Sequence, residues 1–242
     1  DLVGASFGRG FFVLDDYSAL REMTPENLSK KGKLFKPRDA KLFKPRNSLG
    51  NTGGQFYTAK NPEYGAVFTY NLNNVPKTSK SLRMQRERRL NADNKDIPFP
   101  GYDKLTDEMN EKSASIILTI KDSEGNHIRN VKKNASNGSS RIAWNLRHQS
   151  YYPIRAGRGQ ANSWFNPSGP YVTPGEYHAE IYLENNGSVE KLDGPIAFNV
   201  KPLRKGTLEG ASYSDYNSFR TKVSNLYISM SKYQDEFNMM KS

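Results

Sequence analysis

Short runs of alternating apolar and polar residues recur through residues 113–202, and they limit the possible fold more than any other feature. In each run every second residue is apolar, a period typical of a β-strand with one buried face. The apolar positions are Ile116, Leu118 and Ile120; Ile142, Trp144 and Leu146; Tyr177, Ala179, Ile181 and Leu183; and Ile196, Phe198 and Val200. These runs predict strands whose alternate side chains meet in one core.

Turn signals lie between several of these runs. Residues 121–126 and 185–187 carry the Asp, Asn and Gly that tight hairpins favour. A further alternating run contains Phe68, Tyr70 and Leu72. The pattern predicts about seven short antiparallel strands, the number typical of an Ig-like sandwich. We therefore expect a mainly β fold, with an Ig-like antiparallel β-sandwich over residues 63–202 and a surface helix inserted near 77–91.

The sequence of residues 1–23 indicates two strands joined by the turn Gly8-Arg9-Gly10. Leu2, Val3 and Ala5 precede the turn, and Phe11–Leu14 follow it. Two strands do not make a hydrophobic core alone. We expect them to complete a sheet formed by another part of a larger protein, from which this chain is cut.

Residues 24–62 are rich in Pro, Gly, Lys and Asn, and the string Leu-Phe-Lys-Pro-Arg occurs at 34–38 and again at 42–46. Proline disfavours a helix here and favours extended backbone. We therefore expect residues 24–62 to form an extended basic segment, called the strap below. Its Leu and Phe side chains are expected to pack on a neighbouring part of the protein, and its Lys and Arg side chains to face water.

Residues 203–242 predict a C-terminal amphipathic helix. Its apolar residues from Tyr213 to Met240 follow steps of three and four, and Ser212 with Asp215 resembles a capping box. The aromatic face is expected to dock on the sandwich, on the 77–91 helix, or on an absent part of a parent protein.

The formal net charge of +11 is concentrated in two basic stretches, residues 28–48 and 77–95. Such stretches can attract polyanions, although solvated surfaces are the more usual explanation. Nucleic-acid binding ranks last among the hypotheses because no nucleic-acid motif accompanies the charge. The chain has no cysteine, and its sequence predicts no membrane span.

No catalytic, cofactor or metal motif is evident. Asp15 and Asp16 are adjacent on a strand end, so they are expected to point to opposite faces, and to have either a structural role in the turn or a pairing with Arg9 or Arg21. Glutamates 176, 180 and 184 are expected on a solvent-facing strand face. The three histidines (His127, His148 and His178) have no metal-ligand spacing. We predict no catalytic residues, no cofactor and no metal.

The long loop 147–173 is the one candidate binding surface. Exposed aromatic side chains there could stack on sugar rings or on a protein partner. The alternative, which we favour, is that they fold back over a strand edge as a lid. The candidate binding residues are Tyr151, Tyr152, Trp164, Phe165, Arg155 and Arg158.

Several segments together resemble the C-terminal region of sortilin-like β-propeller proteins with BNR-type repeats, often labelled glycosyl hydrolases. The matching segments are Ser6–Asp16, Leu34–Arg38, Asn61–Val67, Ile117–Arg147, Pro174–Tyr177 and the final helix. The resemblance implies an Ig-like domain of the flagellar hook-capping type, placed after a large propeller. It also implies a bacterial protein that is periplasmic, at the cell surface or secreted.

The chain departs from this family at Phe7, where relatives often carry a polar residue, and it lacks the Asp-box of sialidase-like blades. The glycosidase label therefore does not carry over to these residues. We expect a non-catalytic module that braces the end of the propeller and partners the remainder of that protein. The alternative is a carbohydrate-binding accessory module using Tyr151, Tyr152 and Trp164.

Overall fold

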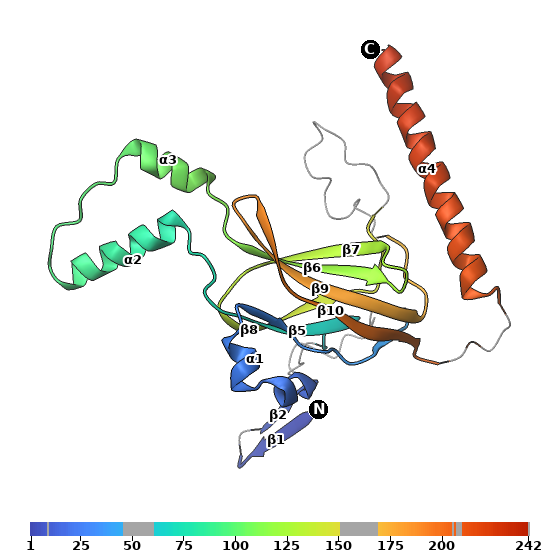
Figure 1. Ribbon diagram of the computed structural model, residues 1–242, viewed down its shortest axis with the longest axis horizontal. Helices are drawn as coiled ribbons and strands as arrows, with labels where there is room; N and C mark the ends of the chain where they lie inside the picture. The colour runs from blue at the N-terminus through green and yellow to red at the C-terminus, as the bar shows by residue number, and fades with distance from the viewer. Residues whose placement is uncertain (9, 46–60, 151–168, 205, 207–209, 242) are drawn as a thin grey trace.

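The computed structural model describes residues 1–8, 10–45, 61–150, 169–204, 206 and 210–241. The chain is mainly β, with more residues in strands than in helices, and it ends in a long helix (Figure 1). The predicted fold class is confirmed at this level.

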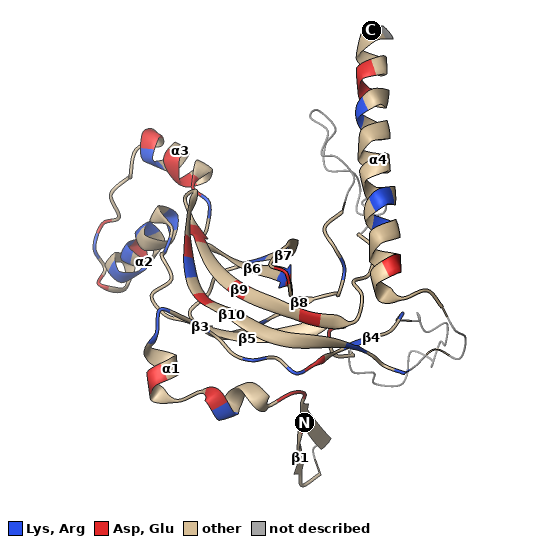
Figure 2. Ribbon diagram, turned by 45° about the vertical axis from the view of Figure 1, so that its right-hand side comes forward, with Lys and Arg blue, Asp and Glu red and all other residues tan. Residues whose placement is uncertain are grey.

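Two sheets form the body of the molecule. One has five strands in the order β4-β10-β9-β6-β7 and curls into a half-barrel, and the other has the order β3-β5-β8 (Figure 2). All pairings in these sheets are antiparallel except that of β4 with β10. The strands are β3 (Gly32–Leu34), β4 (Ala40–Leu42), β5 (Ala66–Leu72), β6 (Ser115–Asp122), β7 (His127–Asn134), β8 (Gly138–Trp144), β9 (Gly175–Asn185) and β10 (Ser188–Pro202).

Side chains from both sheets meet in one hydrophobic core. Trp144 of β8 lies 5.5 Å from Tyr177 of β9 and 6.1 Å from Phe198 of β10, between ring centroids. Phe68 of β5 meets Phe198 edge to face at 5.1 Å. All four side chains are buried. The inward faces predicted for these strands are therefore confirmed.

The strap contributes an edge strand to each sheet, because β3 pairs with β5 and β4 pairs with β10. Leu34 and Phe35 are fully buried and Leu42 packs against the core, whereas Phe43 is 43% exposed. The expected anchoring is confirmed for three of these four apolar side chains. Sequence analysis did not predict the two short helices that precede β3, η1 (Ser18–Glu22) and α1 (Pro25–Ser29).

Two helices form an arm that leaves the sheets, α2 (Ser79–Ala92) and α3 (Tyr102–Asn110) (Figure 1). The surface helix near 77–91 is confirmed, since α2 has no buried residue. The arm is held by Arg83, which donates to both carboxylate oxygens of Glu108 and to Glu87. We did not predict α3, because Pro100-Gly101 indicates a turn and the nine residues after it carry no strong helix signal.

The C-terminal helix α4 (Tyr213–Lys241) begins as predicted. The Ser212 hydroxyl accepts from the Asp215 amide at 3.1 Å and donates to the Asp215 carboxylate at 2.7 Å. Beyond its first turns α4 extends away from the sheets and from α2 (Figures 1 and 2). Most of its aromatic side chains are exposed, so the sheets and α2 do not cover most of this face, and docking on an absent part of a parent protein stays a prediction.

Candidate functional site

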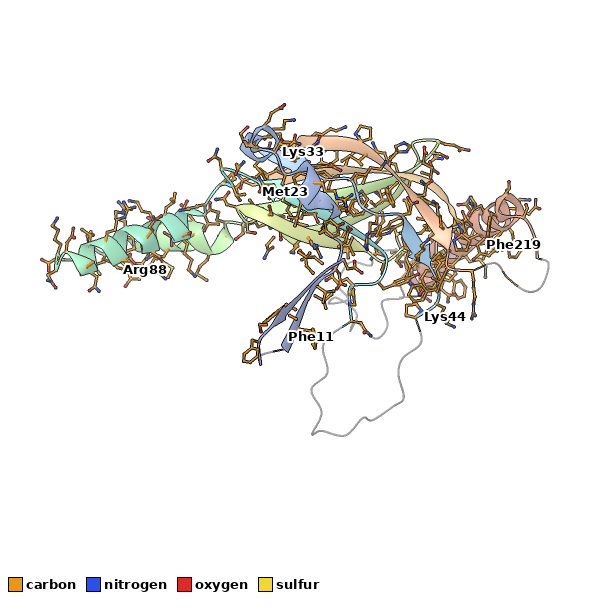
Figure 3. All side chains as sticks on the ribbon, turned by 90° about the horizontal axis from the view of Figure 1, so that it is seen from below. Phe11, Met23, Lys33, Lys44, Arg88 and Phe219 are labelled. Carbon is orange, nitrogen blue, oxygen red and sulfur yellow. The ribbon has the colours of Figure 1, made fainter. Side chains whose placement is uncertain are left out.

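The N-terminal hairpin is an exposed apolar element outside the two sheets of the body. Strands β1 (Leu2–Ser6) and β2 (Gly10–Leu14) pair antiparallel as predicted, and every residue in both strands is exposed. Leu2, Phe12 and Leu14 share one face; Val3, Phe11 and Val13 share the other. In Figure 3 the Phe11 side chain lies on the hairpin well away from the sheets. Because both faces of the hairpin are apolar, both are expected to be buried against other protein surfaces.

Polar contacts join the hairpin to the body. Arg38 of the strap donates to the Asp1 carboxylate at 2.8 Å and lies 3.3 Å from that of Asp16. Arg141 of β8 donates to the Asp16 carbonyl at 2.8 Å. Asp16 pairs with Arg38 rather than with Arg21, because the strap passes the hairpin base, and its bonds from the Ser18 amide and hydroxyl fit the alternative expectation of a role in the turn. Arg9 lies outside the described residues. Arg38 is half exposed, so these ion pairs contribute about 1 kcal/mol or less each.

A groove of about 910 Å³ lies at the hairpin base. Its walls include Asp15 and Asp16 at the end of the hairpin, and Phe43 and Tyr64 next to β4 and β5. The two rings meet edge to face at 4.9 Å, and burial raises the pKa of Tyr64. Sequence analysis missed this groove, since its residues come from five segments with no local motif.

Asp15 and Asp16 both line the groove. The Asp16 carboxylate accepts from the amide and the hydroxyl of Ser18 as well as pairing with Arg38. A general acid needs a carboxyl group with a raised pKa. Ion pairs and hydrogen bonds hold the pKa values of four other carboxyl groups below their ordinary range, those of Asp39, Glu108, Glu180 and Asp193.

Glu180 corrects the expectation of a solvent-facing glutamate row. Its side chain is only 6% exposed, because Lys121 and Lys191 reach over it from the neighbouring strands, at 2.7 and 2.5 Å. The Tyr182 hydroxyl donates to it at 2.9 Å. Burial raises the pKa of Glu180, but the bonds from Lys121, Lys191 and Tyr182 outweigh burial and hold the pKa at about 2. Glu180 is a fixed anion that ties β6, β9 and β10 together.

Replacing Glu180 with Gln is expected to lower the free energy of unfolding by about 2 kcal/mol at pH 7. Because the folded-state pKa is depressed, this stabilisation is complete above the unfolded-state pKa of 4.5 and is lost as pH falls towards about 2. Urea denaturation at pH 7 and pH 3 should show a smaller difference at the lower pH. Glu176→Gln, on the same strand and exposed, is the control; equal losses in both variants would contradict this role.

The histidines lie apart from one another. His127 contacts Asn130 at 2.8 Å, and His178 lies 3.7 Å from Glu176. Burial and, to a smaller extent, the nearby charge of Arg220 lower the pKa of His148 to about 4. Across the described part of the chain, no three His, Asp or Glu side chains gather closely enough to hold a metal ion.

The candidate residues Tyr151, Tyr152, Arg155, Arg158, Trp164 and Phe165 lie outside the described residues. The two ends of that loop are described and packed. Arg147 stacks on Tyr171 at 3.8 Å from the ring centroid, and Tyr171 in turn meets Tyr64 at 6.3 Å. Tyr171, the described aromatic of this loop, therefore folds against the body.

The basic strap is partly neutralised. Lys31 pairs with Glu190, Lys33 with Asp193, and Arg38 with the hairpin aspartates. The other basic stretch lies on α2, out on the arm (Figure 2). The structure therefore does not gather the two stretches into one continuous basic face.

Comparisons with known proteins leave the family open. The described helices include none that is both long and apolar enough to cross a membrane. The sequence matches no protein-family model, and no curated protein shows significant similarity to it.

Proposed function

We propose that this chain is a non-catalytic interaction module that braces the C-terminal end of a larger, secreted β-propeller protein. Its body is an Ig-like sandwich, and the β1–β2 hairpin docks on the propeller. The observation that carries the proposal is the exposure of this hairpin, which is apolar on both faces.

The hairpin geometry supports docking on another sheet. Its two strands pair only with each other among the described residues, so both outer edges offer free backbone donors and acceptors. Isolated two-stranded hairpins are marginally stable, and exposed edges invite further strands. A hairpin with apolar faces on both sides is suited to an inner position between other layers.

The sandwich and the absence of catalysis have separate support. Two sheets share the core around Trp144 and Phe198, as the two layers of a sandwich do. The downward pKa shifts of the buried or paired carboxylates disfavour the acid–base pair that glycoside hydrolysis needs.

The test uses the region encoded upstream of Asp1, expressed separately and titrated with this chain by calorimetry. We expect binding that weakens by roughly 100-fold or more in Phe12→Asp/Val13→Asp, since one charge then lies on each face. Tyr102→Asp/Met109→Asp, which changes two exposed apolar residues of the arm, is the matched control. Urea denaturation should show that both variants keep the stability of the body.

Two results would contradict the proposal. One is the absence of any upstream region that binds, or binding that the hairpin variant leaves unchanged. The other is turnover of a glycoside panel by this chain that disappears when a carboxylate of the groove, such as Asp15, is replaced.

A further inference from the structure

The exposed apolar residues of α4 follow a strict heptad. Successive spacings alternate between three and four residues without a break, which corresponds to positions a and d of a coiled coil. The residues are Tyr216, Phe219, Val223, Leu226, Met230, Tyr233, Phe237 and Met240. Each is between 45% and 80% exposed. The helix therefore presents an uninterrupted seam of largely exposed apolar side chains.

The shape of this seam indicates what covers it. A helix that packs on a sheet or a globular core shows a wide apolar stripe, whereas a seam confined to a and d is typical of helix–helix pairing. Here the flanking e and g positions are polar except for Tyr213 and Tyr227: Asp215, Arg220, Lys222, Ser229, Gln234 and Glu236. The fitting occupant is another helix with the same 3.5-residue period.

The seam is separate from the face of α4 that contacts the body. Near the start of the helix, the Asn217 amide donates to the Thr173 hydroxyl at 2.9 Å. The less exposed residues farther along include Ser224, Ile228 and Ser231, at the b and f positions of the same heptad. Figure 3 shows Phe219, a seam residue, at the side of the helix. A second helix can therefore lie along the seam while α4 keeps its contact with the body.

The seam is also large enough. At 1.5 Å per residue, the 29 residues of α4 span about 43 Å. Covering its eight a and d side chains buries on the order of 800 Å² on each partner, the size of a standard specific interface.

The flanking charges suit pairing of α4 with itself. In a parallel pair, g of one helix faces e of the next heptad of the other, which places Lys222 opposite Tyr227 and Ser229 opposite Gln234. In an antiparallel pair matched at the centre, Lys222 faces Glu236. Neither arrangement places like charges opposite each other in the described flanks. We propose that α4 forms a two-stranded coiled coil with α4 of a second copy of this chain.

Sedimentation equilibrium of the 242-residue chain tests this at roughly 1–100 µM, where moderate interfaces dissociate. We expect a mass rising towards twice 27.4 kDa with concentration. Leu226→Glu/Tyr233→Glu places charges in the seam and should weaken the dimer by roughly 100-fold or more. Ser218→Glu/Asn225→Glu adds the same charge at outward c positions and should leave the dimer intact. Circular dichroism checks that α4 stays helical in both.

A monomer over the whole range would overturn the proposal. So would a dimer that survives Leu226→Glu/Tyr233→Glu but is lost in Phe12→Asp/Val13→Asp, since the hairpin would then be the interface. The native chain has no cysteine, so Leu226→Cys gives the orientation. Disulfide cross-linking marks a parallel pair; a seam-dependent dimer without cross-linking marks an antiparallel one, and both support the coiled coil.

Discussion

Trp144→Ala is expected to lower the free energy of unfolding by about 4 kcal/mol, the largest effect we expect from a single substitution here. Trp144 is fully buried, packs on Tyr177 and Phe198, and donates its indole N–H to the Arg147 carbonyl at 2.9 Å. Its removal leaves a cavity between the two sheets and an unpaired carbonyl. Urea denaturation followed by circular dichroism measures the loss.

Phe99→Ala is the control, because Phe99 lies on the arm and is 64% exposed. This variant should stay within about 0.5 kcal/mol of the native chain. A Trp144→Ala loss as small as that of Phe99→Ala would mean that the two sheets do not depend on one core. The sandwich proposal would then fail with it.

Gly65→Ala is expected to cost about 3 kcal/mol. Gly65 precedes β5 with φ of +112°, and an added Cβ would lie 2.0 Å from the Trp144 carbonyl oxygen. The backbone at Gly65 cannot shift away from this oxygen without breaking the pairing of Ala66 with Trp144, which begins the β5–β8 ladder. The substitution therefore combines an unfavourable φ with a steric clash.

Gly138→Ala separates the cost of the unfavourable φ from the cost of the steric clash. Gly138 pairs with Leu72 at the other end of the same ladder and has φ of +91°, but an added Cβ would meet nothing within 4 Å. We expect a loss of about 1 kcal/mol from the backbone alone. Equal losses at the two glycines, measured by urea denaturation, would show that the Trp144 carbonyl imposes no steric limit.

Elements with a strong local pattern were predictable. The period-two faces of β5, β6, β8 and β9 point to the core, and Asn186-Gly187, both at positive φ, turns the chain between β9 and β10. The α4 periodicity and its Ser212 cap are equally local. In these cases the signal lies within a few residues, so tertiary context has little to change.

The candidate site was predictable only in part. The hairpin and its need for a partner follow from two apolar strands around a glycine turn. The groove does not, because Arg38, Tyr64 and Asp16 converge only when the strap crosses the hairpin base. The loop candidates from Tyr151 to Phe165 lie outside the described residues, so the sequence hypothesis about them stays a prediction.

The amino-acid sequence by itself determined the strands, the tight turns, the terminal helix and the apolar hairpin, because periodicity and turn chemistry act over short distances. Tertiary structure alone decided that the strap supplies an edge strand to each sheet, since β3 and β4 are only three residues long and are defined by their partners. It also decided that Glu180 is buried. The alternation placed this residue on the outer face, but Lys121 and Lys191 cover it from strands that pair with β9 only in the folded sheet.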